Sequence, residues 1–227
     1  MKIVIFAPHP DDELFGCGGS LLKWLDEGND IHLIYLTDNR ALIDWGIKEN
    51  QLIEECAQKY KDLTKDEIAK IALEEAINVS KSIGLPSSNI YLFKIHDQDL
   101  ENNIELAVDL LREIAKGADR FVIPSDNNNH NDHQAAHTIA KKTAIELQLK
   151  DTEFYVYALY NVLKVPRDHQ KKIKIADYRD QLYELMKGYK TQLCLKDTRM
   201  GLETFKRRRS ERFGVFKYNE MNKFENF

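Results

Sequence analysis

The sequence of 227 residues contains no long apolar run. Its hydrophobic stretches fall short of the roughly 18 to 20 residues needed to cross a bilayer, so no membrane span is expected. The opening residues, MKIVIFAP, are apolar over too short a distance for a secretory signal and are predicted to form a strand instead. These two absences predict a protein of the cytoplasm.

Cysteine is also scarce. The three cysteines, Cys17, Cys56 and Cys194, are odd in number, lie far apart and form no CxxC motif. This pattern suits a reducing compartment and argues against a metal site built from thiolates.

The chain has no excess of positive charge. Lys plus Arg number 33 against 37 for Asp plus Glu, and the formal net charge is -4, so a nucleic-acid partner is not expected. The composition, 43% hydrophobic and 31% charged, is that of an ordinary globular protein. At this length we expect one domain over residues 1–227. The oligomeric state stays open, with a homo-oligomer as one option.

Short β-branched runs alternate with segments of helical periodicity. Residues 3–7 and 31–36 are predicted strands joined by a helix over 14–27, which makes a βαβ unit. Further strands are expected at 90–93, 121–124 and 154–160, and helices at 47–83 in two pieces, 104–115, 177–187 and 203–212. The alternation predicts an α/β fold with an open, mostly parallel Rossmann-like sheet and helices on both faces. Residues 1–150 would form the core with the functional site, and residues 151–227 would add strands and helices that shape the pocket.

Two clusters of polar residues follow predicted strands. The first strand is followed by His9-Pro10-Asp11-Asp12-Glu13, and the fourth by a loop that contains His130-Asn131-Asp132-His133. In an open parallel sheet, ligands bind at the carboxyl ends of the strands, so both clusters are expected to face one crevice.

The residue types in these clusters favour a metal site. Two neutral imidazoles and one carboxylate are a common ligand set for catalytic zinc, and His9, Asp12 and His133 supply it. Zinc lowers the pKa of a bound water to about 7, so a nearby carboxylate can take its proton at neutral pH. Asp11, beside a ligand but free of the metal, suits this general base.

The paired motifs closely resemble those of the PIG-L/LmbE-like de-N-acetylases. The resemblance covers residues 1–140 and includes Gly16-Cys17-Gly18-Gly19 and Glu74-Glu75-Ala76. It implies that His9, Asp12 and His133 bind one Zn²⁺ per chain, with other divalent metals as options, and that Asp11 is the base.

The resemblance also implies a role for His130, and Asp132 and Asp97 are further candidates for the site. His130 would steady the oxyanion as a histidinium donor, a kind of group whose loss costs about 10²- to 10³-fold in rate. Asp132 would orient an imidazole, and Asp97, which follows the third strand, would do the same or contact substrate. For Asp97 a simple turn is an equal alternative.

The function expected from these residues is zinc-dependent removal of an acetyl group from a small molecule that contains N-acetylglucosamine. The candidate substrates left open are N-acetylglucosamine itself, its inositol conjugates, a chitin disaccharide, a thiol-sugar precursor and a nucleotide sugar. Two alternatives use the same residues: a non-haem iron enzyme, since two His and one carboxylate also bind iron, and a glycan-binding module without catalysis. The iron chemistry has no use for Asp11, and mere binding requires neither Asp11 nor His130.

Overall fold

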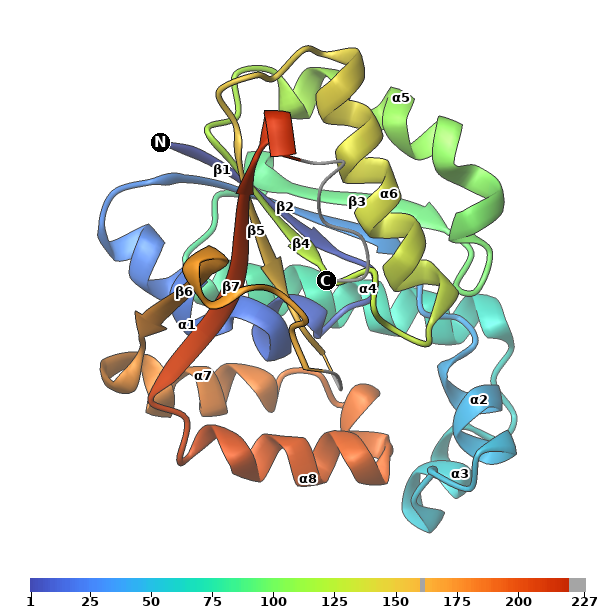
Figure 1. Ribbon diagram of the computed structural model, residues 1–227. Helices are drawn as coiled ribbons and strands as arrows, with labels where there is room; N and C mark the ends of the chain where they lie inside the picture. Colours follow the sequence, from blue (N-terminus) through green and yellow to red (C-terminus); the bar gives the residue numbers. More distant parts are fainter. Residues whose placement is uncertain (160–161, 221–227) are drawn as a thin grey trace.

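The computed structural model describes residues 1–159 and 162–220, and this part of the chain forms a seven-stranded sheet with helices on both faces (Figure 1). The strands are β1 (Lys2–Ala7), β2 (Asp30–Thr37), β3 (Ile90–Ile95), β4 (Arg120–Pro124), β5 (Glu153–Tyr157), β6 (Gln170–Lys174) and β7 (Ser210–Lys217). The helices are α1 (Asp12–Asp26), α2 (Leu42–Lys48), α3 (Glu54–Tyr60), α4 (Lys65–Ile83), α5 (Ile104–Ala115), α6 (Asn131–Glu146), α7 (Arg179–Met186) and α8 (Lys196–Phe205). The predicted α/β class is confirmed.

The strand order is β3-β2-β1-β4-β5-β7-β6. Strands β1 to β5 run parallel to one another, and β7 pairs in antiparallel fashion with β5 on one side and β6 on the other. The chain moves outward from β1 through β2 to β3 and then returns to β4 on the other side of β1. The point where the strand order reverses therefore lies between β1 and β4, and a crevice opens at the carboxyl ends of such a pair.

Alternation along β1 divides the core between the two faces of the sheet. Ile3 and Ile5 contribute to the core under α1, α4, α7 and α8, whereas Val4 and Phe6 contribute to the core under α5 and α6. All four side chains are fully buried, as expected for a strand covered on both faces. Figure 1 shows α5 and α6 on one side of the sheet and α7 with α8 on the other.

Gly16 lets α1 lie close to the sheet. A Cβ atom at this position would sit 2.3 Å from Cδ2 of Tyr157, whose hydroxyl donates a hydrogen bond to the carbonyl oxygen of Phe6 at 2.7 Å. Because an alanine would collide with that ring, glycine fixes the depth at which α1 packs. The start of α1, directly before Gly16, is thereby held near β1.

The segment over residues 47–83 contains more helices than the two predicted. It includes the end of α2, all of α3 and α4, and α2 itself begins earlier, at Leu42. Helix α4 begins with a capping box between Thr64 and Glu67, which makes a separate start for a third helix. The segment thus has one more break than the two predicted pieces require, and its helix-forming composition does not mark both breaks.

The prediction of a helix over 203–212 is wrong. Helix α8 ends at Phe205, and Ser210–Lys217 forms β7 between β5 and β6. Phe213 and Phe216 are buried against partners distant in sequence, and local periodicity carries no information on such pairing. The strand predicted at 154–160 ends at Tyr157, and Tyr160 lies outside the described residues.

The cysteine prediction also needs correction. Cys56 in α3 and Cys194, at the end of the short helix Gln192–Cys194, form a disulfide across 138 residues, and Cys17 is free and buried. The bond ties the α2–α3 segment to the chain ahead of α8, inside a small core with Ile43 and Tyr60. The cysteine argument for a reducing compartment therefore no longer holds.

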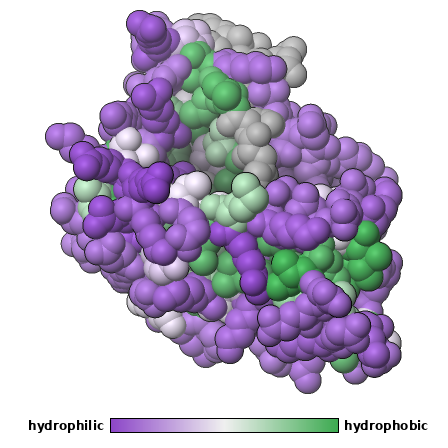
Figure 2. Space-filling model, turned by 90° about the horizontal axis from the view of Figure 1, so that it is seen from below, coloured by the Kyte–Doolittle hydropathy of each residue, from purple (hydrophilic) through white to green (hydrophobic). Residues whose placement is uncertain are grey.

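Among the described residues, none of the helices combines the length and apolarity that a bilayer crossing requires. The face seen from below, which carries α8 and α3, is mostly hydrophilic, and its hydrophobic residues gather in patches (Figure 2).

Candidate active site

The first part of the site is the turn between β1 and α1. The amide of Asp12 donates to the carbonyl oxygen of His9 at 3.3 Å, and both the amide and the hydroxyl of Thr37 donate to the carbonyl of Pro8, which anchors the turn to β2. Asp11 has a left-handed backbone, with φ of 105°. Such a conformation is strained for a residue with a Cβ and is found mostly where the surroundings enforce it.

The second part is the start of α6, beyond β4. His130 is the N-cap of the helix, and its Nδ1 accepts the amide of Asp132 at 3.2 Å. A neutral His130 therefore carries its proton on Nε2. Its own amide donates to Asn128 Oδ1 at 2.9 Å, which fixes the loop ahead of the helix. Asp132 and His133 lie in the first turn of α6 and are buried.

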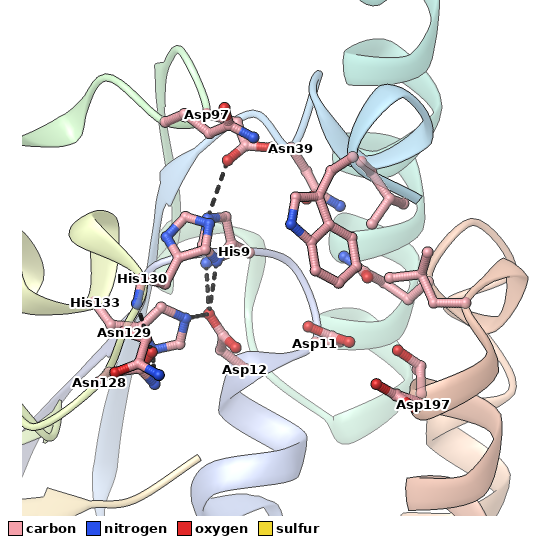
Figure 3. Close-up of a pocket in the computed structure, with 16 residues that line it drawn as sticks. His9, Asp11, Asp12, Asn39, Asp97, Asn128, Asn129, His130, His133 and Asp197 are labelled. Carbon is pink, nitrogen blue, oxygen red and sulfur yellow. Dashed lines mark hydrogen bonds and ion pairs between the residues drawn. The ribbon is translucent and has the colours of Figure 1, made fainter. Parts of the chain in front are cut away.

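These two parts bring His9, Asp12 and His133 together. Oδ2 of Asp12 lies 3.2 Å from His9 Nδ1 and 3.4 Å from His133 Nε2, and ligand atoms of all three residues lie within 4.8 Å of one another (Figure 3). Ligands of tetrahedral zinc at about 2.0 to 2.1 Å are separated by roughly 3.3 to 3.4 Å. The donor set and its spacing fit a zinc-sized divalent cation.

The other ring nitrogen of His9 faces two carboxylates. Nε2 lies 3.2 Å from Oδ2 of Asp132 and 3.2 Å from Oδ1 of Asp97. Asp132 is held in turn by the amides of Gln98 and Leu100, at 2.8 and 3.1 Å. A carboxylate on the far nitrogen orients an imidazole and makes it a better metal ligand.

The surroundings of His9 and His133 shift the pKa values of the two imidazoles in opposite directions. Burial lowers the pKa of His9, but the carboxylates of Asp12, Asp132 and Asp97 outweigh burial and raise it well above the usual value. The carboxylates therefore stabilise a positive charge at His9, which a proton supplies in the absence of a metal ion. Burial, followed by repulsion from neighbouring histidines, lowers the pKa of His133 to about 4. His133 is therefore neutral at pH 7, as a metal ligand must be.

Two further groups titrate abnormally. Burial, with repulsion from Asp12 and Glu13, raises the pKa of Asp11 well above its usual value, which moves this carboxyl group towards the range of a general base. Burial and the proximity of His9 lower the pKa of His130. This lowering favours neutral His130 over the expected histidinium, with the remaining proton on Nε2.

Asp11 is held in place by a buried chain of polar groups. Its amide donates to Oε2 of Glu13 at 3.1 Å, and Oε1 of Glu13 accepts the hydroxyl of Tyr189 at 2.5 Å. The hydroxyl of Tyr35 lies 2.8 Å from that of Tyr189 and 3.0 Å from Ser80 Oγ. The C-terminal part of the chain thus supports the strained turn that presents Asp11.

A cavity of about 440 Å³ extends from the cluster. The three proposed ligands, Asp11, Asp97 and His130 line one end of it. The opposite wall comes from elements that the motif analysis left out: Asn39 after β2, Leu42 and Trp45 of α2, Gln192 and Leu195 ahead of α8, and Asp197 and Thr198 of α8. Figure 3 shows Asp11 between the His9 cluster and Asp197.

The structure brings together all seven residues singled out in the sequence: His9, Asp11, Asp12, Asp97, His130, Asp132 and His133. Sequence reasoning missed the far wall. Asn128 lies in a run of three asparagines directly before His130, whereas Trp45 and Asp197 carry no local signal in the sequence. Gln192 lies beyond residues 1–140, to which the motif resemblance is confined, and its Nε2 donates to the carbonyl of Pro10 at 2.8 Å.

Comparison with known families identifies a family that the chain matches. The model of the PIG-L family, described as GlcNAc-PI de-N-acetylase, matches residues 4–144. The match covers more than half of the chain and includes both motifs.

A curated relative is a glucosamine-6-phosphate deaminase-like protein of Bacteroides thetaiotaomicron. It is 25% identical over 202 residues, and the alignment covers 69% of this chain. The chain spans only 30% of the length of that relative.

Solved structures share the fold. The N,N'-diacetylchitobiose deacetylase of Pyrococcus horikoshii superposes with a TM-score of 0.72 at 19% identity, covering 96% of this chain and 85% of that one. A teicoplanin deacetylase in its zinc-inhibited form superposes with a TM-score of 0.71 at 12% identity, covering 96% and 98%. At these identities the likeness establishes the fold alone.

Proposed function

The chain belongs to the PIG-L family of de-N-acetylases, and from this membership we propose that it is a zinc-dependent hydrolase that removes the acetyl group from a small molecule containing N-acetylglucosamine. The observation that carries the proposal is the meeting of His9, Asp12 and His133 beside Asp11, at the edge of one cavity. The products would be a free amine and acetate.

His9, Asp12 and His133 would hold the metal, one ion per chain. When bound, a divalent cation would polarise the acetamide carbonyl and acidify a water molecule. Two imidazoles and one carboxylate are a common ligand set for catalytic zinc. Other divalent metals accept the same ligands.

Asp11 would carry the proton through the reaction. Its carboxylate takes a proton from the attacking water as the water oxygen bonds to the acetyl carbon. The C–N bond then breaks, and Asp11 returns the proton to the departing nitrogen, so that a neutral amine leaves. The raised pKa of Asp11 supports this double role, because the acid form must persist long enough to protonate the amine.

His130 would stabilise the negative charge that develops on the carbonyl oxygen. Its Nδ1 is engaged with the amide of Asp132, so Nε2–H is left to donate into the cavity. Asp97 and Asp132 act through His9 by orienting its ring.

We also propose that residues 1–227 form one domain, in which residues 151–227 complete the pocket.

The test compares zinc-loaded and chelated protein on a panel of N-acetylated sugars, with new primary amine and acetate measured separately. We expect equimolar amine and acetate from the zinc-loaded protein and neither from the chelated one. Loading with iron under air and under nitrogen separates the alternative chemistry, since hydrolysis is indifferent to oxygen. Sugar binding without amine release in every metal form would favour the glycan-binding alternative and refute the hydrolase.

A further inference from the structure

The outer wall of the cavity contains a buried donor without a partner. Nδ2 of Asn39 makes no hydrogen bond within the described residues, although the side chain is buried and lines the cavity. Buried amide groups are nearly always paired, so an unpaired one in a pocket wall indicates an acceptor that a ligand brings. Asn39 also has a left-handed backbone, with φ of 59°, which asparagine tolerates better than most residues.

Beyond the histidines of the proposed metal site, the charged side chains on the cavity wall are all carboxylates. Four aspartates line it, namely Asp11, Asp12, Asp97 and Asp197, and no Lys or Arg is present among the described lining residues. The guanidinium of Arg40, on the residue after Asn39, is bound to Asp38 at 2.8 Å and Asp66 at 3.1 Å. A metal ion would offset the charge only at the inner end, so a phosphate on the outer part of a substrate would meet the carboxylate of Asp197 without a counter-ion.

The remaining wall suits the apolar face of a sugar. Trp45 is half-buried and stands with Leu42 and Leu195 along the cavity, and Asp197 is exposed at its mouth. Aromatic rings beside a few placed polar groups are the usual lining of a site for a small organic ligand. A volume of about 440 Å³ is at the lower end of the roughly 300 to 1,000 Å³ of such sites.

We propose that this outer wall is a subsite for an uncharged sugar unit or its amino derivative, and that it excludes phosphorylated and other anionic acetamido sugars. Asn39 donates to a ring or hydroxyl oxygen of the substrate, Trp45 packs against its apolar face, and Asp197 accepts from a hydroxyl or ammonium group at the mouth. The inference rests on the proposed function for the orientation of the substrate. Among the candidate substrates it selects neutral glycosides over nucleotide sugars and sugar phosphates.

Binding tests the subsite without turnover. The chain has two tryptophans, of which Trp24 is buried in the core and Trp45 lines the cavity, so quenching of tryptophan fluorescence reports on the outer wall. Chelated protein is titrated with N,N'-diacetylchitobiose, N-acetylglucosamine and N-acetylglucosamine 6-phosphate. We expect the disaccharide to bind at least tenfold more tightly than the phosphate, and Trp45→Phe to abolish the signal.

Two variants assign the selectivity. Asp197→Asn, which keeps the shape and removes the charge, should narrow the preference for neutral over phosphorylated sugar several-fold, mainly through tighter binding of the phosphate. Asn39→Asp tolerates the same backbone and replaces the donor by an acceptor, so the disaccharide should bind about tenfold more weakly. The control Asp151→Asn, an exposed acid ahead of β5 and outside the cavity lining, should leave the preference unchanged.

Turnover by the zinc-loaded protein separates the two proposals. If no acetamido sugar is deacetylated while neutral disaccharide still binds selectively, the proposed function fails and the subsite stands. If sugars are deacetylated but the phosphorylated one binds as tightly as the neutral one, the subsite proposal is refuted and the hydrolase stands. If both proposals hold, Asn39→Asp should raise KM for the disaccharide far more than it lowers kcat.

Discussion

Replacing Asp132 with Asn should weaken metal binding and destabilise the fold by amounts that the structure allows to be worked out. The side chain is fully buried, accepts the amides of Gln98 and Leu100, and faces His9 Nε2 at 3.2 Å. Asparagine has nearly the same shape but presents an NH₂ group to one of these donors. One hydrogen bond to a charged acceptor is lost and one buried amide is left unpaired, which costs about 2 to 3 kcal/mol.

The pKa of Asp132 reflects the same contacts through the ionisation of the carboxyl group. Burial alone would raise it, but the bond to His9 and the amide of Gln98 outweigh burial and lower the pKa from 3.8 to about 2. At about 1.4 kcal/mol per unit, this lowering stabilises the folded protein by about 2 kcal/mol. The contribution is present above pH 3.8 and is lost as the pH falls through 2.

Two measurements check this prediction. Urea unfolding of the chelated protein at pH 7 should show a loss of about 2 to 3 kcal/mol, and chelator competition should show metal affinity 10- to 100-fold lower. The control is Asp109→Asn, an exposed acid on α5 paired with Arg112, for which at most about 1 kcal/mol is expected. An Asp132→Asn protein that binds zinc as tightly as the parent would show that this carboxylate does not orient a ligand.

Three further changes have defined outcomes. Asp11→Asn should retain zinc by elemental analysis while turnover falls about 10²- to 10⁴-fold, and unchanged turnover would remove Asp11 from the mechanism. Changing both Cys56 and Cys194 to Ser should lower the free energy of unfolding by up to about 5 kcal/mol, because the disulfide closes a loop of 138 residues; superimposed urea curves for variant and parent would contradict this. Burial raises the pKa of Glu13 from 4.5 to about 7, so the folded state holds this proton more tightly and its stabilising contribution is lost as the pH rises from 4.5 through 7. The chelated protein should therefore lose about 3 kcal/mol from this group across that window, and Glu13→Gln, measured at pH 5 and pH 8, should show a correspondingly flatter dependence.

Local pattern was enough to predict the first four strands and several helices. The helix over 104–115 matches α5 at both ends because its apolar face is regular and polar residues flank it. The strands over 3–7 and 121–124 were found within one residue of their starts, since buried parallel strands read as continuous β-branched runs. The antiparallel edge was not foreseen, because β7 is stabilised by pairing with β5 and β6 and not by its own periodicity.

The part of the site formed by the two motifs could be predicted from the sequence for a related reason. His9, Asp11 and Asp12 lie within four residues, and His130 to His133 within another four, so each half of the cluster is a local motif that follows a recognisable strand. The carboxyl ends of parallel strands meet at one edge, and this rule brings the two halves together without knowledge of the full structure.

The amino-acid sequence by itself determined the fold class, the two motifs and the chemistry that their residues can perform, because these depend on neighbours along the chain. Only the tertiary structure decided that Cys56 meets Cys194, that Tyr189 supports the turn of Asp11 through Glu13, and that Asn39, Trp45 and Asp197 line the same cavity. Each of these contacts joins segments 100 or more residues apart or positions a side chain without any local pattern. Such contacts form only when the whole core has packed, and they are the contacts that would select the substrate.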